Sequence, residues 1–83
     1  MWIKSQDGKR IVNTDNVTSI FLEYIHRGNT DALKYINILT DNPHHGGVFE
    51  LGKYETESKA TEVLNRIYES ITDKDSFYLM PEN

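Results

Sequence analysis

The sequence predicts an α+β domain: an antiparallel β-sheet of four to five strands with one amphipathic C-terminal helix packed on one face, followed by a short last strand. Residues 1–51 contain short runs rich in β-branched and aromatic residues, separated by turn formers. After Thr56 the apolar residues recur at helical spacing, and 77–80 has strand composition again. A chain of 83 residues has room for one domain, which we expect to span 1–83.

The first two strands are expected to form a hairpin. Residues 2–6 and 9–13 flank Asp7-Gly8, a pair that predicts a two-residue type I′ turn because both of its positions need positive φ. Such a turn places Trp2 and Ile11 on one face of the hairpin. On the other face, the predicted cross-strand partners are Ile3 with Val12 and Ser5 with Arg10.

Three further runs, at 17–24, 32–39 and 48–51, have the composition of strands. Alternation predicts which side chains share a face. The expected groups are Ile20, Leu22 and Tyr24 on the first, and Ile36 and Ile38 opposite Tyr35 and Leu39 on the second. The turn formers at 13–16 and 26–31 separate these runs.

A helix over about 56–72 is predicted by apolar residues at 3.6-residue spacing. The predicted buried face is Ala60, Val63, Leu64, Ile67 and Ile71. Either Thr56 or Ser58 can cap its N-terminus, and Glu62 precedes Arg66 by the four residues that favour an ion pair. The run 73–75 ends the helix, and 77–80 before Pro81 predicts a strand at a sheet edge, where proline is tolerated.

The stretch TDNPHHGGVF, residues 40–49, suggests either a metal site or a turn. Adjacent histidines in extended chain point to opposite sides, so His44 and His45 have the wrong spacing for one metal ion, and only His26 or Asp41 could add ligands. Asn42-Pro43 begins a turn, and Gly46-Gly47 supplies positive φ. We therefore expect a hairpin loop and no metal site.

Composition restricts the setting and the partners. The chain has no cysteine, and neither a signal sequence nor an apolar stretch long enough to span a bilayer is evident. We expect a cytoplasmic protein without membrane contact. The net charge is −4, with most acidic residues after residue 40, which disfavours a surface that follows nucleic-acid phosphates.

No constellation of catalytic residues is evident. Motifs that activate a serine are absent, and Gly46-Gly47 lacks the lysine and the context of a phosphate loop. Asp41, Glu50, Glu55 and Glu57 could in principle supply a carboxylate pair, but acids at this density are usually solvated. We therefore predict no enzyme, no catalytic residue and no cofactor.

One helix covers only one face of a small sheet, so apolar side chains remain for the other face. The candidates are Trp2, Ile11, Phe21 and Tyr35. Such a patch predicts a protein partner, and a homo-oligomer is the simplest way to cover it. Trp2 and Tyr24 are the predicted anchors, because interface centres are enriched in Trp and Tyr.

The preferred function is therefore a non-enzymatic protein–protein interaction module. The alternative is a binder of single-stranded nucleic acid, in which bases stack on an aromatic sheet face near Arg10, Arg27 and Lys34. The acidic total ranks this alternative second. The sequence does not identify the partner or the process.

Three segments carry a resemblance: WIKSQDGKRIVN at 2–13, LGKYETESKATEVLNRI at 51–67 and FYLMPEN at 77–83. They are similar to short uncharacterised proteins of Gram-positive bacteria and their phages, which open with Trp or Leu followed by Ile-x-Ser-Gln-Asp. The resemblance covers both ends but not 24–47. It implies a lineage and no activity, so no functional residue is carried over from it.

Overall fold

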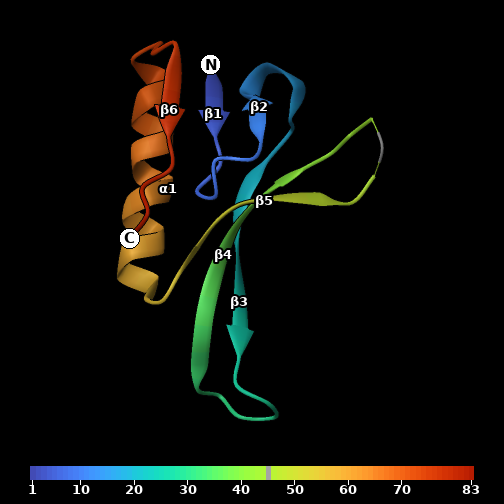
Figure 1. The fold of residues 1–83 in the computed structure, drawn as a ribbon, viewed down its shortest axis with the longest axis vertical. Coiled ribbons are helices and arrows are strands. Elements are labelled where there is room, and N and C mark those ends of the chain that lie inside the picture. The colour runs from blue at the N-terminus through green and yellow to red at the C-terminus, as the bar shows by residue number, and fades with distance from the viewer. Residues whose placement is uncertain (45) are drawn as a thin grey trace.

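The computed structural model describes residues 1–44 and 46–83 and has the predicted α+β class, with one helix followed by a short last strand (Figure 1). Its elements are β1 (Trp2–Lys4), β2 (Ile11–Asn13), the 3₁₀ turn η1 (Thr14–Asn16), β3 (Ile20–His26), β4 (Leu33–Asp41), β5 (Val48–Tyr54), α1 (Glu57–Thr72) and β6 (Phe77–Leu79). The strands divide into two three-stranded sheets instead of one. We call β2-β1-β6 the small sheet and β3-β4-β5 the long sheet.

The first hairpin has the predicted register. Ile3 pairs with Val12 in the antiparallel ladder of β1 and β2, and both side chains are buried. Trp2 and Ile11 lie on the other face and are exposed. The alternation of the two strands therefore decides which side chains enter the core.

The predicted two-residue turn at Asp7-Gly8 is wrong. Gly8 has φ +74°, but Asp7 does not have positive φ. The Gly8 N–H donates to the Ser5 carbonyl at 2.9 Å, and the Ser5 N–H donates to the Arg10 carbonyl at 2.9 Å, so four residues form the loop. The Asp7 carboxylate accepts from the Ser5 hydroxyl at 2.6 Å and from the Lys9 N–H at 2.9 Å. These side-chain bonds favour the wider loop.

All three strands of the long sheet end later than predicted, and β3 and β4 also begin later, whereas β5 begins at Val48 as predicted. The segment before β3 is held by Asp41, whose Oδ1 accepts from the N–H groups of Thr18 and Ser19, so pairing starts only at Ile20. The ladder of β4 and β5 shifts register between Ile38 and Leu39, and Leu51 is the extra residue. A bulge of this kind bends the strands. In Figure 1 the outer ends of β4 and β5 accordingly project sideways as an arm.

The helix is confirmed close to its predicted bounds, and Thr56 is the N-cap. Its side-chain oxygen accepts from the Lys59 N–H at 3.1 Å. Ala60, Val63 and Ile67 are buried, whereas Ile71 at the end of the predicted buried face is 44 % exposed. No helix in 1–44 or 46–83 is long and apolar enough to cross a membrane.

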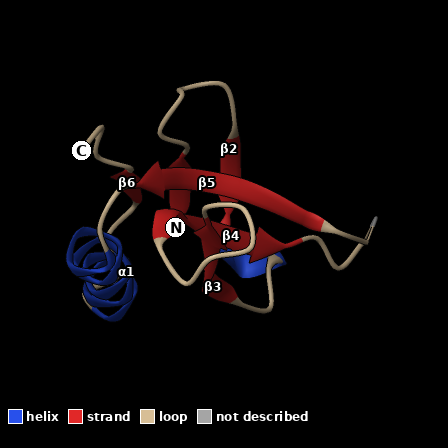
Figure 2. Ribbon diagram, turned by 90° about the horizontal axis from the view of Figure 1, so that it is seen from below, coloured by secondary structure: helices blue, strands red, loops and turns tan. Residues whose placement is uncertain are grey.

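The last strand, β6, lies at the edge of the small sheet, as predicted, but it runs parallel to β1. The Met80 N–H continues the pairing by donating to the Lys4 carbonyl at 3.1 Å. Seen along the long axis in Figure 2, α1 lies along one side of the strands. The core is contributed by both sheets and the helix: Ile3, Val12, Ile36, Ile38, Leu51, Tyr54, Ala60, Val63, Ile67 and Met80.

Candidate interaction surface

The outer face of the small sheet carries a group of large apolar side chains that no described part of the chain covers. Residues paired across neighbouring strands lie on the same face. Trp2 pairs with Phe77, and Lys4 pairs with both Ile11 and Leu79. The exposed fractions are 51 % for Trp2, 62 % for Ile11, 63 % for Phe77 and 59 % for Leu79. We call these four residues the outer patch.

The outer patch is continuous and has little charge. Its side chains, with Lys4 and Tyr78, line a shallow hollow of about 400 Å³. Lys4 is the one charged residue of this lining. Its Cε lies 3.7 Å from the position that a Cβ on Gly8 would take, so the lysine stem leans toward the β1–β2 loop. The amine therefore extends toward the edge of the patch and leaves its centre apolar.

Exposure of this kind is unfavourable for an isolated domain. Fully burying one large apolar side chain contributes about 1.5–3 kcal/mol, and four such side chains here are more than half exposed. Contiguous apolar patches on small proteins usually mark sites of association. The face opposite, with Ile3 and Val12, already packs into the core, so the outer patch is available to a partner.

The structure places the two predicted anchors on different sheets. Trp2 belongs to the outer patch. Tyr24 is 42 % exposed on the long sheet and pairs with the core residue Ile36, so it lies on the face that packs toward α1. A hydrogen bond with the Glu57 carboxylate raises the pKa of the Tyr24 hydroxyl above its usual value. Tyr24 is thus already engaged with the start of the helix.

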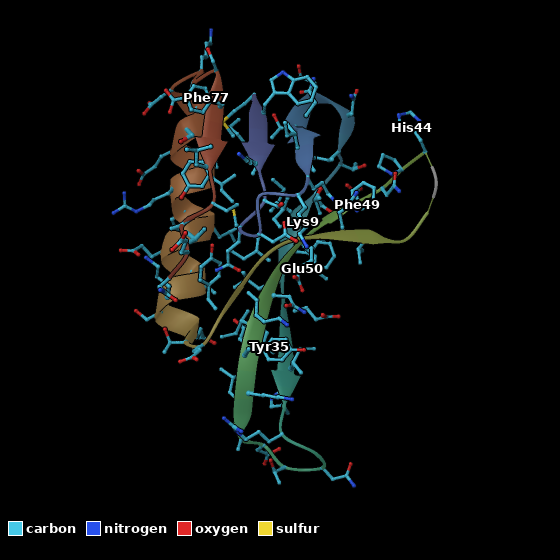
Figure 3. All side chains as sticks on the ribbon, in the orientation of Figure 1. Lys9, Tyr35, His44, Phe49, Glu50 and Phe77 are labelled. Carbon is cyan, nitrogen blue, oxygen red and sulfur yellow. The ribbon has the colours of Figure 1, made fainter. Side chains whose placement is uncertain are left out.

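The predicted patch of Trp2, Ile11, Phe21 and Tyr35 is only half assembled. Trp2 and Ile11 share a face, but Phe21 and Tyr35 belong to the long sheet. Figure 3 shows Tyr35 well away from Phe77, along the lower part of β4. The prediction failed here because it assumed one sheet, in which all outward side chains would share a face.

Phe77 and Leu79 complete the outer patch and were not predicted to be part of it. Their alternation with the half-buried Tyr78 indicates a strand with one outward face. That signal identifies the face but not the neighbour. The pairing of β6 with β1 joins opposite ends of the chain, and no local pattern specifies it.

The TDNPHHGGVF stretch contains the predicted turn. The Gly46 N–H donates to the Asn42 carbonyl at 2.7 Å, and both Gly46 and Gly47 have φ +76°. His44 lies at the tip of the arm in Figure 3, while His26 ends β3. Residue 45 lies outside the described residues, and those described hold no group of three side chains that could ligate a metal.

The cations of the nucleic-acid alternative lie beside aromatic rings, but not at the outer patch. The Arg10 guanidinium lies 3.8 Å from the centroid of the Phe49 ring. Lys34 lies 5.9 Å from the Tyr35 centroid, and Arg27 lines the same hollow as Lys34. Two separate cation–aromatic clusters therefore replace the single basic aromatic face that was expected.

Comparison of the chain with protein-family models, with curated proteins and with solved structures finds no match. The similarity of both chain ends to short proteins of Gram-positive bacteria and phages stays a prediction.

Proposed function

We propose that this chain is a non-enzymatic protein–protein interaction module that associates with a second copy of itself through the outer patch. The observation that carries the proposal is the contiguous exposure of Trp2, Ile11, Phe77 and Leu79 on one sheet face. The proposed setting is the cytoplasm of a Gram-positive bacterium, either uninfected or infected by a phage. The absence of cysteine and the resemblance of the chain ends support that setting.

A second copy is the favoured partner because the outer patch itself carries no negative charge. Two molecules of net charge −4 repel each other at long range. The lining of the outer patch contains no carboxylate, so that repulsion is weakest where the two copies would meet. A two-fold axis through the patch would bury both copies of the same apolar face at once.

The position of the only tryptophan makes the proposal directly measurable. Trp2 is half-exposed in the outer patch, so its fluorescence reports whether the patch is covered. We expect the emission maximum to shift to shorter wavelength as protein concentration rises. Sedimentation equilibrium over the same concentrations should show a dimer forming in parallel.

The variant Phe77→Ser tests the patch while keeping the Trp2 probe. We expect it to stay monomeric and to keep the emission of an exposed indole. The matched control is Tyr68→Ser, since Tyr68 is 68 % exposed on α1 and lies outside the patch. A wild-type chain that sediments as a monomer with concentration-independent emission would contradict self-association. Equal weakening by both substitutions would point to another surface.

A further inference from the structure

A second surface feature lies where β5 leaves the long sheet. β5 ends at Tyr54, opposite Ile36, while β4 extends back to Leu33, so the first residues of β4 have no β5 neighbour. The helix begins shortly afterwards at Glu57. A hollow of about 590 Å³ opens at this junction. Its lining is Arg27, Lys34, Tyr35, Lys53, Tyr54, Glu55, Thr56, Lys59 and Asn83. We call it the basic hollow.

The basic hollow concentrates positive charge on an acidic protein. Four of the nine lysine and arginine residues of the chain line it, against a single acidic side chain, that of Glu55. Glu57 follows Thr56 in sequence but is not part of the lining. Gathering like charges costs free energy, which a bound anion would offset.

Most of these cations lack an ionic partner among residues 1–44 and 46–83. Lys59 lies 3.1 Å from the Glu62 carboxylate. In the described part of the chain, Arg27, Lys34 and Lys53 have no carboxylate within 4.0 Å. No described carboxylate therefore forms an ion pair with these three side chains.

The lysines are also positioned by an aromatic ring. The Lys53 Nζ lies 4.4 Å from the centroid of Tyr35, and the Lys34 Nζ lies 5.9 Å from it. Both distances are within the range of cation–π attraction, so each amine interacts with the Tyr35 ring. The cap residue Thr56 lines the hollow too, which brings the positive end of the α1 dipole to the same place.

We propose that the basic hollow binds the polyphosphate group of a small ligand. Several adjacent anionic oxygens match several unneutralised cations better than a single carboxylate would, and phosphate oxygens form strong charge-assisted hydrogen bonds with Arg and Lys. The volume is in the range of small-molecule sites, roughly 300–1,000 Å³. The basic hollow shares no lining residue with the outer patch, so this proposal is independent of self-association.

The test is a titration of the full chain with inorganic tripolyphosphate at low ionic strength, followed by amide chemical shifts. We expect the amides of Lys34, Tyr35 and Lys53 to move with saturation, while the Trp2 indole signal stays unchanged. The double variant Lys34→Gln/Lys53→Gln should raise the Kd by about tenfold or more, because it removes two charge-assisted contacts.

The control is Lys9→Gln/Lys74→Gln, which changes the net charge equally but lies outside the basic hollow. It should bind tripolyphosphate nearly as well as the wild type, and thermal unfolding should show both double variants folded. Equal weakening in both double variants, or no shift at the hollow at millimolar tripolyphosphate, would overturn the proposal. Shifts at the hollow with a short oligothymidylate but not with tripolyphosphate would overturn it in favour of a nucleic-acid strand.

Discussion

The hydroxyl of Tyr54 donates a hydrogen bond to the carbonyl of Pro81 at 2.7 Å. Tyr54 ends the long sheet and Pro81 follows the edge strand of the small sheet, so this bond joins the two sheets at the C-terminal end of the chain. The Gln6 N–H makes a second connection by donating to the Leu51 carbonyl at 2.7 Å, at the bulge of β5. Contacts between the sheets therefore stabilise the arrangement that forms the outer patch.

Tyr54→Phe should make stability less sensitive to alkaline pH. Burial raises the pKa of Tyr54 to about 12, from an ordinary value of about 10. At pH values below the ordinary pKa, Tyr54 is protonated in both the folded and the unfolded chain. Between the two values the unfolded chain loses the proton while the folded chain retains it, so the free energy of unfolding falls as pH rises. Urea unfolding at about pH 8 and about pH 11 measures this fall.

At neutral pH the same variant should lose about 0.5–1.5 kcal/mol, the usual contribution of one hydrogen bond. The control is Tyr68→Phe, whose hydroxyl is on the exposed surface of α1. If the free energy of unfolding of Tyr54→Phe fell with alkaline pH as steeply as that of the wild type, Tyr54 would not titrate as its burial implies.

Gly52→Ala should destabilise the chain by about 1–3 kcal/mol through overpacking. A Cβ at Gly52 would lie 2.9 Å from Tyr54 Cε2 and 3.1 Å from Met80 Cε. Gly52 does not have positive φ, so the cost arises from these contacts and not from backbone strain. Chemical denaturation gives the loss, and the ring resonances of Tyr54 should shift. Gly47→Ala, with no atom within 4 Å of its Cβ, should leave those resonances unchanged.

Gln6→Ala should cost about 1–3 kcal/mol, because one carboxamide connects three segments. Gln6 Nε2 donates to the Glu82 carbonyl at 2.7 Å and to the Lys53 carbonyl at 3.1 Å, while Oε1 accepts from the Lys53 N–H at 2.8 Å. Gln6→Glu keeps the acceptor for the Lys53 N–H but turns a carboxylate oxygen toward these carbonyl oxygens, so it should be at least as destabilising as Gln6→Ala. Thermal unfolding compares them with Asn65→Ala on the exposed surface of α1, for which no loss is expected. Equal stability of all variants would show that the carboxamide contributes nothing.

Asp41→Asn should make the free energy of unfolding less dependent on pH in the acid range. Hydrogen bonds from Thr18 and from the Ser19 N–H lower the pKa of the Asp41 carboxyl below its usual 3.8. The stabilisation that the ionised Asp41 contributes is fully present at pH values above its usual pKa. It is lost as the pH falls through the lower pKa of the folded state. Asparagine keeps an oxygen acceptor but does not titrate, so its unfolding free energy should fall less below about pH 4. Unfolding series in acid compare it with Asp31→Asn, which should behave as the wild type does.

Local sequence patterns predicted the elements whose contacts join residues close together in the chain. The pairing of Ile3 with Val12 follows from alternation and a short connection, and it survived the error in turn type because both loops give the same register. The helix follows from its apolar spacing and the Thr56 cap. Strand ends were less accurate, since Asp41 delays β3 and the bulge at Leu51 lengthens β5.

By itself, the sequence determined the α+β class, the register of the first hairpin, the helix and the outward direction of Trp2 and Ile11. Periodicity and turn chemistry act between near neighbours, so they leave a readable pattern. Only the tertiary structure decided that the strands form two sheets, that β6 pairs in parallel with β1, and that Phe77 and Leu79 complete the outer patch. It likewise gathered the basic hollow from β4, β5, the loops after β3 and β5, α1 and Asn83. Such pairings between distant segments depend on packing over the whole chain, which no local run of residues encodes.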